Sequence, residues 1–341
     1  MIRRRSSSLR LEEKLMNNQS AIARKGRRPS VKELLVNYGL YGVFIALIIF
    51  FTLQNPKFLA INNLITIVQM ASTLGVVVVG MFFVLIAGGI DIAVASNMYF
   101  SAVVACTLLN NFQMPILMCF VVSTLCGAFI GCINGTFITR FKMLPFITTL
   151  AVSSIARGLG LMVSKTKLIV LDSSAFVVSN TRIFGIPLVA YIFMVTVIIG
   201  HIILTRTTFG RQLFACGNNV QGAQKIGINT GRTIFVAYVI CGAMAGLAGM
   251  MNACNLASVN QNFAIGDEFV VISSAIVGGA SLFGGKGRVL PGALLGMIMV
   301  QAIMNGLTLM QANPYIYQVI RGVVIFIAVM IDSIKYSGEI R

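Results

Sequence analysis

Long apolar runs, separated by short polar segments, follow one another along the chain after residue 33. A helix needs about 20 mainly apolar residues to cross roughly 30 Å of hydrocarbon. Because backbone groups in lipid must bond within their own segment, such runs predict helices. The pattern therefore predicts an all-α polytopic membrane protein with about ten transmembrane helices, of which the third and eighth have the weakest signal. These helices are expected at 34–53, 64–87, 92–109, 115–139, 146–164, 186–205, 233–257, 267–283, 289–311 and 315–333.

Composition supports membrane insertion and excludes a soluble globular protein. Of the 341 residues, 57% are hydrophobic and 10% are charged, and the mean hydropathy is +0.90. Soluble domains carry about 25% charged residues. The longest predicted loops, 206–232 and about 165–185, are too short to form independent domains. The expected organisation is a basic tail at 1–33, a transmembrane domain at 34–333 and a short C-terminus at 334–341.

The positive charges predict the orientation of the chain. If the N-terminus is cytoplasmic, inner segments hold twenty Lys and Arg and outer segments hold four. This asymmetry agrees with the positive-inside rule, so both termini are predicted to be cytoplasmic in a bacterial inner membrane. Ten of the basic residues lie in the first 32 positions, which favours contact with anionic lipid over nucleic-acid binding.

No catalytic or metal-binding motif is present in the sequence. The seven cysteines form no CxxC pair, and the segment 280–287 lacks the first glycine and the hydroxyl residue of a phosphate-binding loop. His201 is the only histidine, and only nine carboxylates occur. An ion-driven carrier usually places acidic or histidine relays within its helices. Their scarcity argues against such a carrier, although Asp91 and His201 keep that alternative open.

Glycine patterns predict close helix packing and helix breaks. Gly127, Gly131 and Gly135 recur every fourth residue, a spacing that lets backbones approach closely. The same spacing occurs at 242–246 and 292–296, and ordinary packing explains most of these positions. The glycines at 88–89, 278–279 and 284–287 instead interrupt apolar runs, where a broken helix exposes backbone dipoles to a polar solute.

Five blocks of the sequence resemble one known family. They are the stretch from Gly80 to Ser96, which contains Gly88-Gly89-Ile-Asp91; Asn134-Gly135 with Leu144-Pro145-Phe146 and Arg157-Gly158; Thr207 to Asn219 with Ala223 and Gly227-Ile228; Glu268 with Ile276 to Gly285; and Asn305-Gly306. Together these blocks are similar to the permease subunits of bacterial ABC importers for ribose, galactose, xylose and similar monosaccharides, over about 63–332. The chain departs from the family pattern at Ala93 and Ala95, and in the third block at Asn218, Gln221 and Gly222.

The resemblance implies a type II, vitamin B12 importer-like ABC permease architecture and a non-enzymatic role. Two permease copies would pair in the lipid membrane, bind cytoplasmic ABC ATPase subunits and receive sugar from a periplasmic binding protein. ATP and Mg²⁺ would bind to the ATPase, and this chain would carry no cofactor and no metal. The 206–232 loop would couple the permease to the ATPase through Gly210, Arg211, Ala215, Gly217, Asn218, Asn219, Ala223 and Gly227.

The expected mechanism is alternating access, in which ATP-driven closure of the ATPase moves the coupling loops and turns the pathway from one side to the other. A neutral sugar requires many weak hydrogen bonds rather than a strong charge. The candidates for this pathway are Gln69, Gly89, Asp91, Asn97, Asn134, Asn252, Asn255, Ser273, Ser274, Gln301 and Asn305. For Asp91, capping the helix that follows Gly89 is favoured over contact with sugar. A polyol, a sugar-like signal or a branched-chain amino acid remains an alternative cargo.

Overall fold

The computed structural model describes residues 31–171 and 178–339, so most of the predicted basic tail lies outside the described residues. The structure is built almost entirely from helices. They are α2 (Val31–Gln54), η1 (Pro56–Leu59), α3 (Ile61–Ile86), α4 (Val94–Phe112), α5 (Ile116–Thr139), α6 (Pro145–Ser164), α8 (Leu188–Arg206), α9 (Thr208–Asn218), α10 (Val220–Lys225), α11 (Thr230–Leu256), α12 (Asp267–Val277), α13 (Val289–Leu309) and α14 (Pro314–Glu339).

Within the described residues, seven helices are long and apolar enough to cross a membrane: α3, α5, α6, α8, α11, α13 and α14. The prediction of a polytopic helical membrane protein is thereby confirmed. The eighth predicted run, 267–283, is not one helix, because α12 has only 11 residues. At 1.5 Å per residue it covers about 16 Å, roughly half of the hydrocarbon layer. Gly279 follows it with φ +94°, a conformation that ends the helix.

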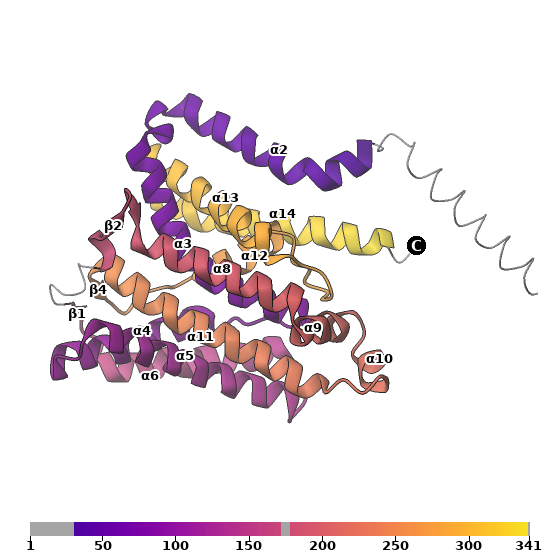
Figure 1. The fold of residues 1–341 in the computed structure, drawn as a ribbon. Helices are drawn as coiled ribbons and strands as arrows, with labels where there is room; N and C mark the ends of the chain where they lie inside the picture. The colour runs from indigo at the N-terminus through magenta and orange to yellow at the C-terminus, as the bar shows by residue number, and fades with distance from the viewer. Residues whose placement is uncertain (1–30, 172–177, 340–341) are drawn as a thin grey trace, which may run out of the picture. The chain divides into compact units, whose positions relative to one another are not determined.

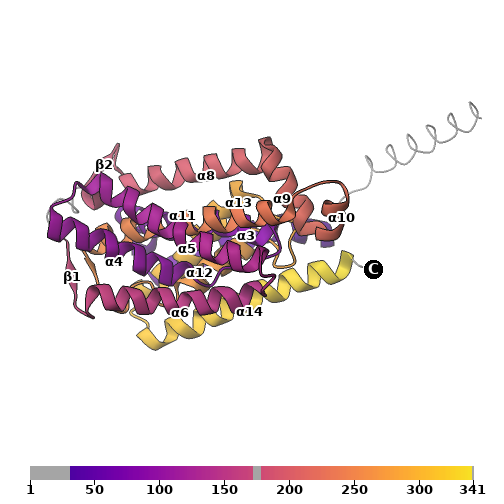
Figure 2. The ribbon, with the colours of Figure 1, turned by 90° about the horizontal axis from the view of Figure 1, so that it is seen from below.

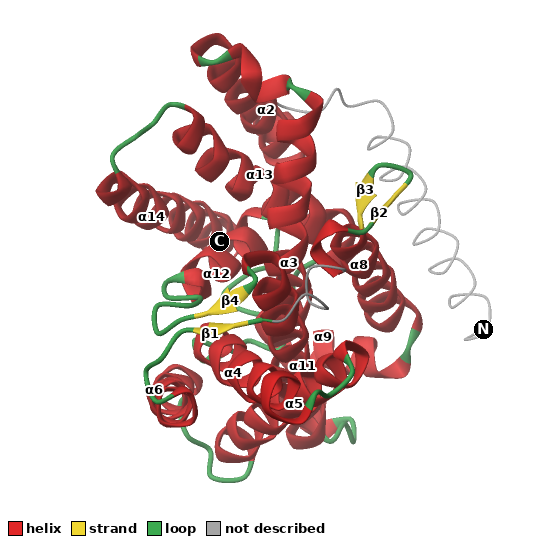
Figure 3. Ribbon diagram, turned by 90° about the vertical axis from the view of Figure 1, so that its left-hand side faces the viewer, coloured by secondary structure: helices red, strands yellow, loops and turns green. Residues whose placement is uncertain are grey.

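From α3 onward the long helices run side by side, as Figures 1 and 2 show. The short helices α9 and α10 lie at one end of this bundle. Two short antiparallel strand pairs lie at the other end: β1 (Ile169–Val170) with β4 (Ser258–Val259), and β2 (Arg182–Ile183) with β3 (Ile186–Pro187). Seen along the bundle in Figure 3, α11 occupies a central position, and it packs against α3, α4 and α5.

The crossing of α5 and α11 confirms that regularly spaced glycines allow close packing. A Cβ atom added to Gly127 would lie 2.7 Å from the Cα atom of Gly246, and Ser123 Oγ donates a 2.6 Å hydrogen bond to the Gly246 carbonyl. At the same crossing, Asn97 Nδ2 of α4 donates to the carbonyls of Gly127 and Gly242, at 3.1 and 3.2 Å. Three helices therefore meet at one backbone-to-backbone contact.

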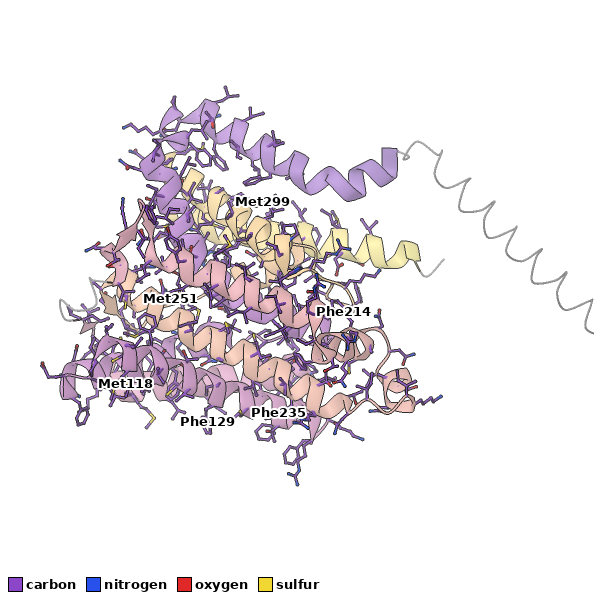
Figure 4. All side chains as sticks on the ribbon, in the orientation of Figure 1. Met118, Phe129, Phe214, Phe235, Met251 and Met299 are labelled. Carbon is purple, nitrogen blue, oxygen red and sulfur yellow. The ribbon has the colours of Figure 1, made fainter. Side chains whose placement is uncertain are left out.

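Large apolar side chains on the outside of the bundle contrast with those inside it. Met251 of α11 is fully buried, whereas Met118 and Phe129 of α5 are 55% and 63% exposed. Figure 4 shows Met118 and Phe129 along the outer side of the helices. Exposed apolar surface on this scale is unfavourable in water and favourable against lipid tails. The exposed faces are therefore those of a membrane protein.

Candidate functional site

The break between α3 and α4 places Asp91 in the interior. Gly88 has φ +80° and ends α3, and Asp91 is 2% exposed. Its Oδ1 atom accepts hydrogen bonds from the Ala93 amide at 2.9 Å and from Asn134 Nδ2 at 3.2 Å. The Tyr238 hydroxyl occupies the space beside Gly89, where a Cβ atom would collide with it. Asp91 thus bonds to backbone just before α4 and does not line an open surface.

Several other pathway candidates are buried within the bundle. Asn97 holds the α5–α11 crossing described above. Asn134 is fully buried, and its Oδ1 atom has no hydrogen-bond partner among the residues that the structure describes. In α12, Ser273 Oγ donates to the Phe269 carbonyl of its own helix, and Ser274 Oγ is buried with no partner in the described part of the chain. The tertiary structure separates these residues from the more accessible candidates.

Most of the remaining amide candidates make hydrogen bonds that link α3 to α11 or α3 to α13. Gln69 Nε2 donates to Asn255 Oδ1 at 3.3 Å, and Asn255 Nδ2 donates to Thr73 Oγ1 at 2.9 Å. On the α13 side, Gln301 Nε2 lies 3.3 Å from Met70 Sδ. We use the term amide seam for the following residues: Gln69, Thr73, Asn252, Asn255, Gln301 and the Asn63–Asn305 pair.

The amide seam is partly open and uncharged. Gln69, Asn63, Asn252 and Asn255 are half-buried, although Asn252 makes no hydrogen bond among those resolved by the structure. Met70, beside Gln69 on α3, is 49% exposed. The seam lies toward the strand-pair end, because α11 ends at Leu256 immediately before β4. Asn63 and Thr73 were not among the residues predicted from sequence, since single polar residues of a helix do not reveal their partners.

At the other end of the bundle, side-chain caps define the segment that contains α9 and α10. Thr207 Oγ1 accepts from the Gly210 amide at 3.2 Å and begins α9. Asn219 Oδ1 accepts from the Gly222 amide at 2.8 Å and begins α10. Asn229 Oδ1 accepts from the Arg232 amide at 3.0 Å and begins α11. These three caps satisfy helix-terminal amides and fix the turns between the helices.

The small residues predicted for coupling mostly face the chain itself. A Cβ atom added to Gly210 would strike the Leu204 carbonyl, and one added to Gly217 would strike the Ile86 carbonyl. Ala223 is 3% exposed. Ala215 is half-buried, and Gly227 ends α10 with φ +83°. Within this chain, the small side chains permit close approach between α9, α3 and the glycine-rich segment 284–287.

The outward face of α9 and α10 combines polar and apolar side chains. Arg211, Asn218 and Asn219, which the sequence assigns to the coupling loop, are exposed. Val220 and Ile226 are also exposed, at 41% and 75%. Sequence reasoning missed these two residues because β-branched side chains near a membrane protein's loops are ordinarily assigned to the core. We call Val220, Ile226 and the three exposed polar residues the α9–α10 face.

Half-buried charged side chains at the strand-pair end make polar or charged contacts. Arg157 of α6 donates from Nη1 to the Phe263 carbonyl at 2.8 Å and stacks over the Tyr99 ring, 4.6 Å from its centroid. Arg321 Nη2 of α14 lies 3.9 Å from Asp267 Oδ1. Such partners lower the cost of placing cations within the membrane region.

The described residues contain no cluster of His, Cys, Asp or Glu suited to hold a metal ion. All seven cysteines are free thiols. In α9, outside the long helices, burial raises the pKa of the Cys216 thiol above its usual range, because a thiolate would lose its hydration. Cys216 is therefore an unreactive packing residue.

Comparison with known proteins decides the family. Residues 63–329 match the model of the family described as "Branched-chain amino acid transport system / permease component". The chain belongs to this family of transport permeases. The match covers the amide seam, the broken segments and the α9–α10 face, and the chain is accordingly a transport component and not an enzyme.

Individual relatives of this permease cover nearly its whole length. It is 32% identical to the probable ABC transporter permease protein YphD of Escherichia coli K12, over 90% of this chain and 93% of that one. It is 30% identical to the galactose/methyl galactoside import permease MglC of the same organism, over 88% and 95%. The ribose import permease RbsC of Haemophilus influenzae Rd is 28% identical, over 94% and 98%. No solved structure is significantly similar to the chain.

Proposed function

We propose that this chain is the transmembrane permease subunit of an ATP-driven ABC importer that moves a monosaccharide, a pentose or a hexose, across the bacterial inner membrane. The names of its relatives support this cargo, because they describe import permeases for galactose and ribose. The relatives match over most of both chains, so the inference concerns the whole membrane domain. It does not extend to one particular sugar.

The observation that carries the proposal is the chemistry of the amide seam. Gln69, Asn255 and Asn63 present amide groups that both donate and accept hydrogen bonds, and no charged side chain belongs to the seam. A neutral polyhydroxy solute is recognised by such groups. An ion or a zwitterionic amino acid would instead be held by charged groups or by exposed helix ends. The half-buried seam residues are therefore the proposed contacts of the passing sugar.

The α9–α10 face is the proposed docking site for the cytoplasmic ATPase. Exposed Ile226 and Val220 provide apolar contact area, and Arg211, Asn218 and Asn219 supply the polar contacts around it. The partner ATPase would bind ATP and Mg²⁺, and its closure would pull on α9. Since Gly217 packs against the end of α3, this movement would reach the helix that carries Gln69. Alternating access would follow, with two permease copies rocking about their shared pathway.

Ten membrane segments with both termini in the cytoplasm complete the proposal. The seven long apolar helices would be joined by α2, α4 and the short α12. This arrangement would put the α9–α10 face inside and the strand pairs outside, where a periplasmic sugar-binding protein would deliver the cargo. The glycine break after α12 would make it a half-helix, as occurs in transport sites. A type II permease architecture is proposed on the same basis.

Reconstitution in liposomes tests the proposal. The permease is inserted alone and then together with its candidate ATPase and binding protein, and uptake of labelled pentoses and hexoses is followed with and without ATP. We expect uptake only when all components and ATP are present. Gln69→Leu should reduce uptake about tenfold or more, the scale of one lost hydrogen-bonding group that contacts the solute. The control Thr124→Val removes a hydroxyl that bonds only to the Phe120 carbonyl of its own helix, and should change uptake less than twofold.

Each contrary result has a definite meaning. ATP-dependent uptake of leucine or valine, but of no sugar, would assign the cargo that the family description names. Uptake by the permease alone, driven by an ion gradient, would overturn the importer proposal. It would favour an ion-driven carrier in which Asp91 and His201 act as a relay. Equal uptake by Gln69→Leu and the unmodified permease would show that the amide seam does not contact the passing sugar.

A further inference from the structure

A pocket of about 530 Å³ lies between α8, α9 and the segment that leads into α13. His201 contributes to its wall from α8, Arg211 and Phe214 from α9, and Lys286 and Arg288 from the connecting segment. Figure 4 shows Phe214 at the bundle end occupied by α9. The volume lies within the usual range for pockets that bind small molecules or headgroups. We call this cavity the basic pocket.

The charge of the basic pocket is strongly one-sided. Arg211, Lys286 and Arg288 are exposed and converge on it, and no acidic residue is among its lining residues. Three cations held around one concavity repel one another and attract an anion, since a cleft concentrates the electrostatic potential. The chemistry therefore favours an occupant that carries negative charge and several acceptor oxygens.

The unpartnered nitrogen of His201 also favours an occupant with acceptor oxygens. Its Nδ1 atom is buried and has no hydrogen-bond partner within the described structure, although the residue lines the pocket. A buried polar nitrogen without a partner costs free energy, so a ligand that bonds to it is stabilised. A phosphate group supplies oxygen acceptors for guanidinium, ammonium and imidazole donors together. Phosphate is thus a group that fits the three exposed cations, with His201 beside them in the pocket wall.

The surroundings of the pocket indicate that the phosphate belongs to a lipid. Ile198 and Ile202 of α8 are 46% and 49% exposed, and they lie within one helical turn of His201. The pocket is near the end of this membrane-length helix, which stops at Arg206. An apolar ridge that leads to a basic cavity at helix-end depth matches a lipid with its acyl chains on the helix and its headgroup in the cavity.

We propose that the basic pocket binds the phosphate headgroup of an anionic phospholipid from the surrounding membrane. This inference goes beyond the proposed sugar transport and does not depend on the cargo or on the ATPase. Because Arg211 and Phe214 belong to α9, a bound headgroup would hold α9 against α8 and the start of α13. The occupant would therefore stabilise the segment that is proposed to receive the ATPase.

Lipid binding to the purified full-length chain tests this proposal directly. The delipidated protein in neutral detergent is titrated with dioleoyl phosphatidylglycerol or dioleoyl phosphatidylcholine, and bound lipid is counted by native mass spectrometry. We expect one phosphatidylglycerol to bind more tightly than further copies and more tightly than phosphatidylcholine. Lys286→Gln/Arg288→Gln should weaken this first binding event about tenfold or more, because each basic residue near a lipid surface contributes appreciably to attraction.

A matched control separates a site from general surface charge. Arg140→Gln/Lys142→Gln removes two exposed cations from the connection between α5 and α6, outside the basic pocket, and should change the affinity less than twofold. Arg211→Gln/Lys286→Gln repeats the test with a second pair of exposed pocket residues, should the first variant fail to fold. Unchanged thermal unfolding of the lipid-free variants shows that they fold.

The proposal is overturned if the control pair weakens binding as much as the pocket pair, because the attraction would then be diffuse. It is also overturned if phosphatidylcholine binds equally well. A third arm adds inorganic phosphate or glycerol 3-phosphate at millimolar concentration. We expect neither to displace the lipid; displacement together with full binding of the soluble anion would assign the pocket to a soluble phosphate instead.

Discussion

Asn63 of α3 and Asn305 of α13 exchange two hydrogen bonds, each amide nitrogen donating to the other's oxygen at 2.9 and 3.0 Å. Asn63 Nδ2 also donates to the Phe58 carbonyl at 2.9 Å. Asn305 is 7% exposed and Asn63 is half-buried, so the pair is partly shielded from solvent. The two residues are 242 positions apart in sequence, and together they join the start of the amide seam to the C-terminal half of the bundle.

Breaking this pair should destabilise the fold in a non-additive way. Asn305→Leu leaves the Asn63 amide without its partner, and we expect the midpoint of thermal unfolding in detergent to fall. Hydrogen bonds between membrane helices couple by about 0.6 kcal/mol on average and up to about 1.7 kcal/mol. A double-mutant cycle with Asn63→Leu should give a coupling free energy in that range. A coupling free energy of zero would show that the pair contributes nothing to stability.

Gly127 should tolerate no side chain. A Cβ atom there meets the backbone of α11, so Gly127→Val must push α5 and α11 apart and break the Asn97 bonds at the crossing. We expect loss of monodisperse protein in size-exclusion chromatography. Gly158→Ala is the control, because a Cβ at Gly158 of α6 meets nothing within 4 Å. It should be neutral or stabilise the helix by up to about 1 kcal/mol. Equal behaviour of the two variants would contradict the observed crossing.

Ile226 should be essential for coupling and dispensable for folding. Its side chain is 75% exposed at the end of α10, so Ile226→Asp places a charge in the proposed ATPase interface while removing little buried surface. We expect the thermal unfolding midpoint to stay within about 2 °C and ATP-dependent uptake to fall at least tenfold, on the scale of an interface anchor. Ile226→Leu should retain uptake. Leu168→Asp, equally apolar and 58% exposed at the opposite end, should leave ATPase binding unchanged.

Labelling of introduced cysteines tests the orientation of the bundle. Lys225→Cys on α10 should react with a membrane-impermeant maleimide only in inside-out vesicles, and Lys167→Cys beside β1 only in right-side-out vesicles. Native Cys216 should contribute little background, since it is 1% exposed and burial raises the pKa of its thiol, which keeps it protonated at neutral pH. Labelling of Lys225→Cys from the periplasmic side would reverse the proposed topology.

Several features were predictable from sequence because they depend on local patterns. The long apolar runs predicted helices, and those at 64–87 and 233–257 correspond closely to α3 and α11. The four-residue glycine spacing predicted close helix packing, since that spacing places glycines on one helix face, and the structure shows such packing where α5 crosses α11. The run at 267–283 was read as one span because hydropathy counts residues and does not register where Gly278 and Gly279 stop a helix.

The candidate sites were only partly predictable, because hydrogen-bond partners are distant in sequence. Gln69 and Asn255 were selected as polar residues in apolar surroundings, and the structure joins them. Asn97 met the same criterion but binds backbone at a helix crossing. Gly217 was predicted from the family resemblance to belong to the coupling loop, and the structure adds that it packs on the Ile86 carbonyl. One-dimensional patterns identify such residues without indicating which neighbour each one meets.

The sequence by itself determined the membrane environment, the helical class and the resemblance to sugar permeases, because hydrophobic length and local motifs are properties of contiguous residues. Only the tertiary structure decided which polar side chains meet, such as Asn63 with Asn305, and which basic residues converge, such as Arg211 with Arg288. Those relationships arise from helix packing between segments far apart in the chain, where each side chain's surroundings are set by its neighbours in space.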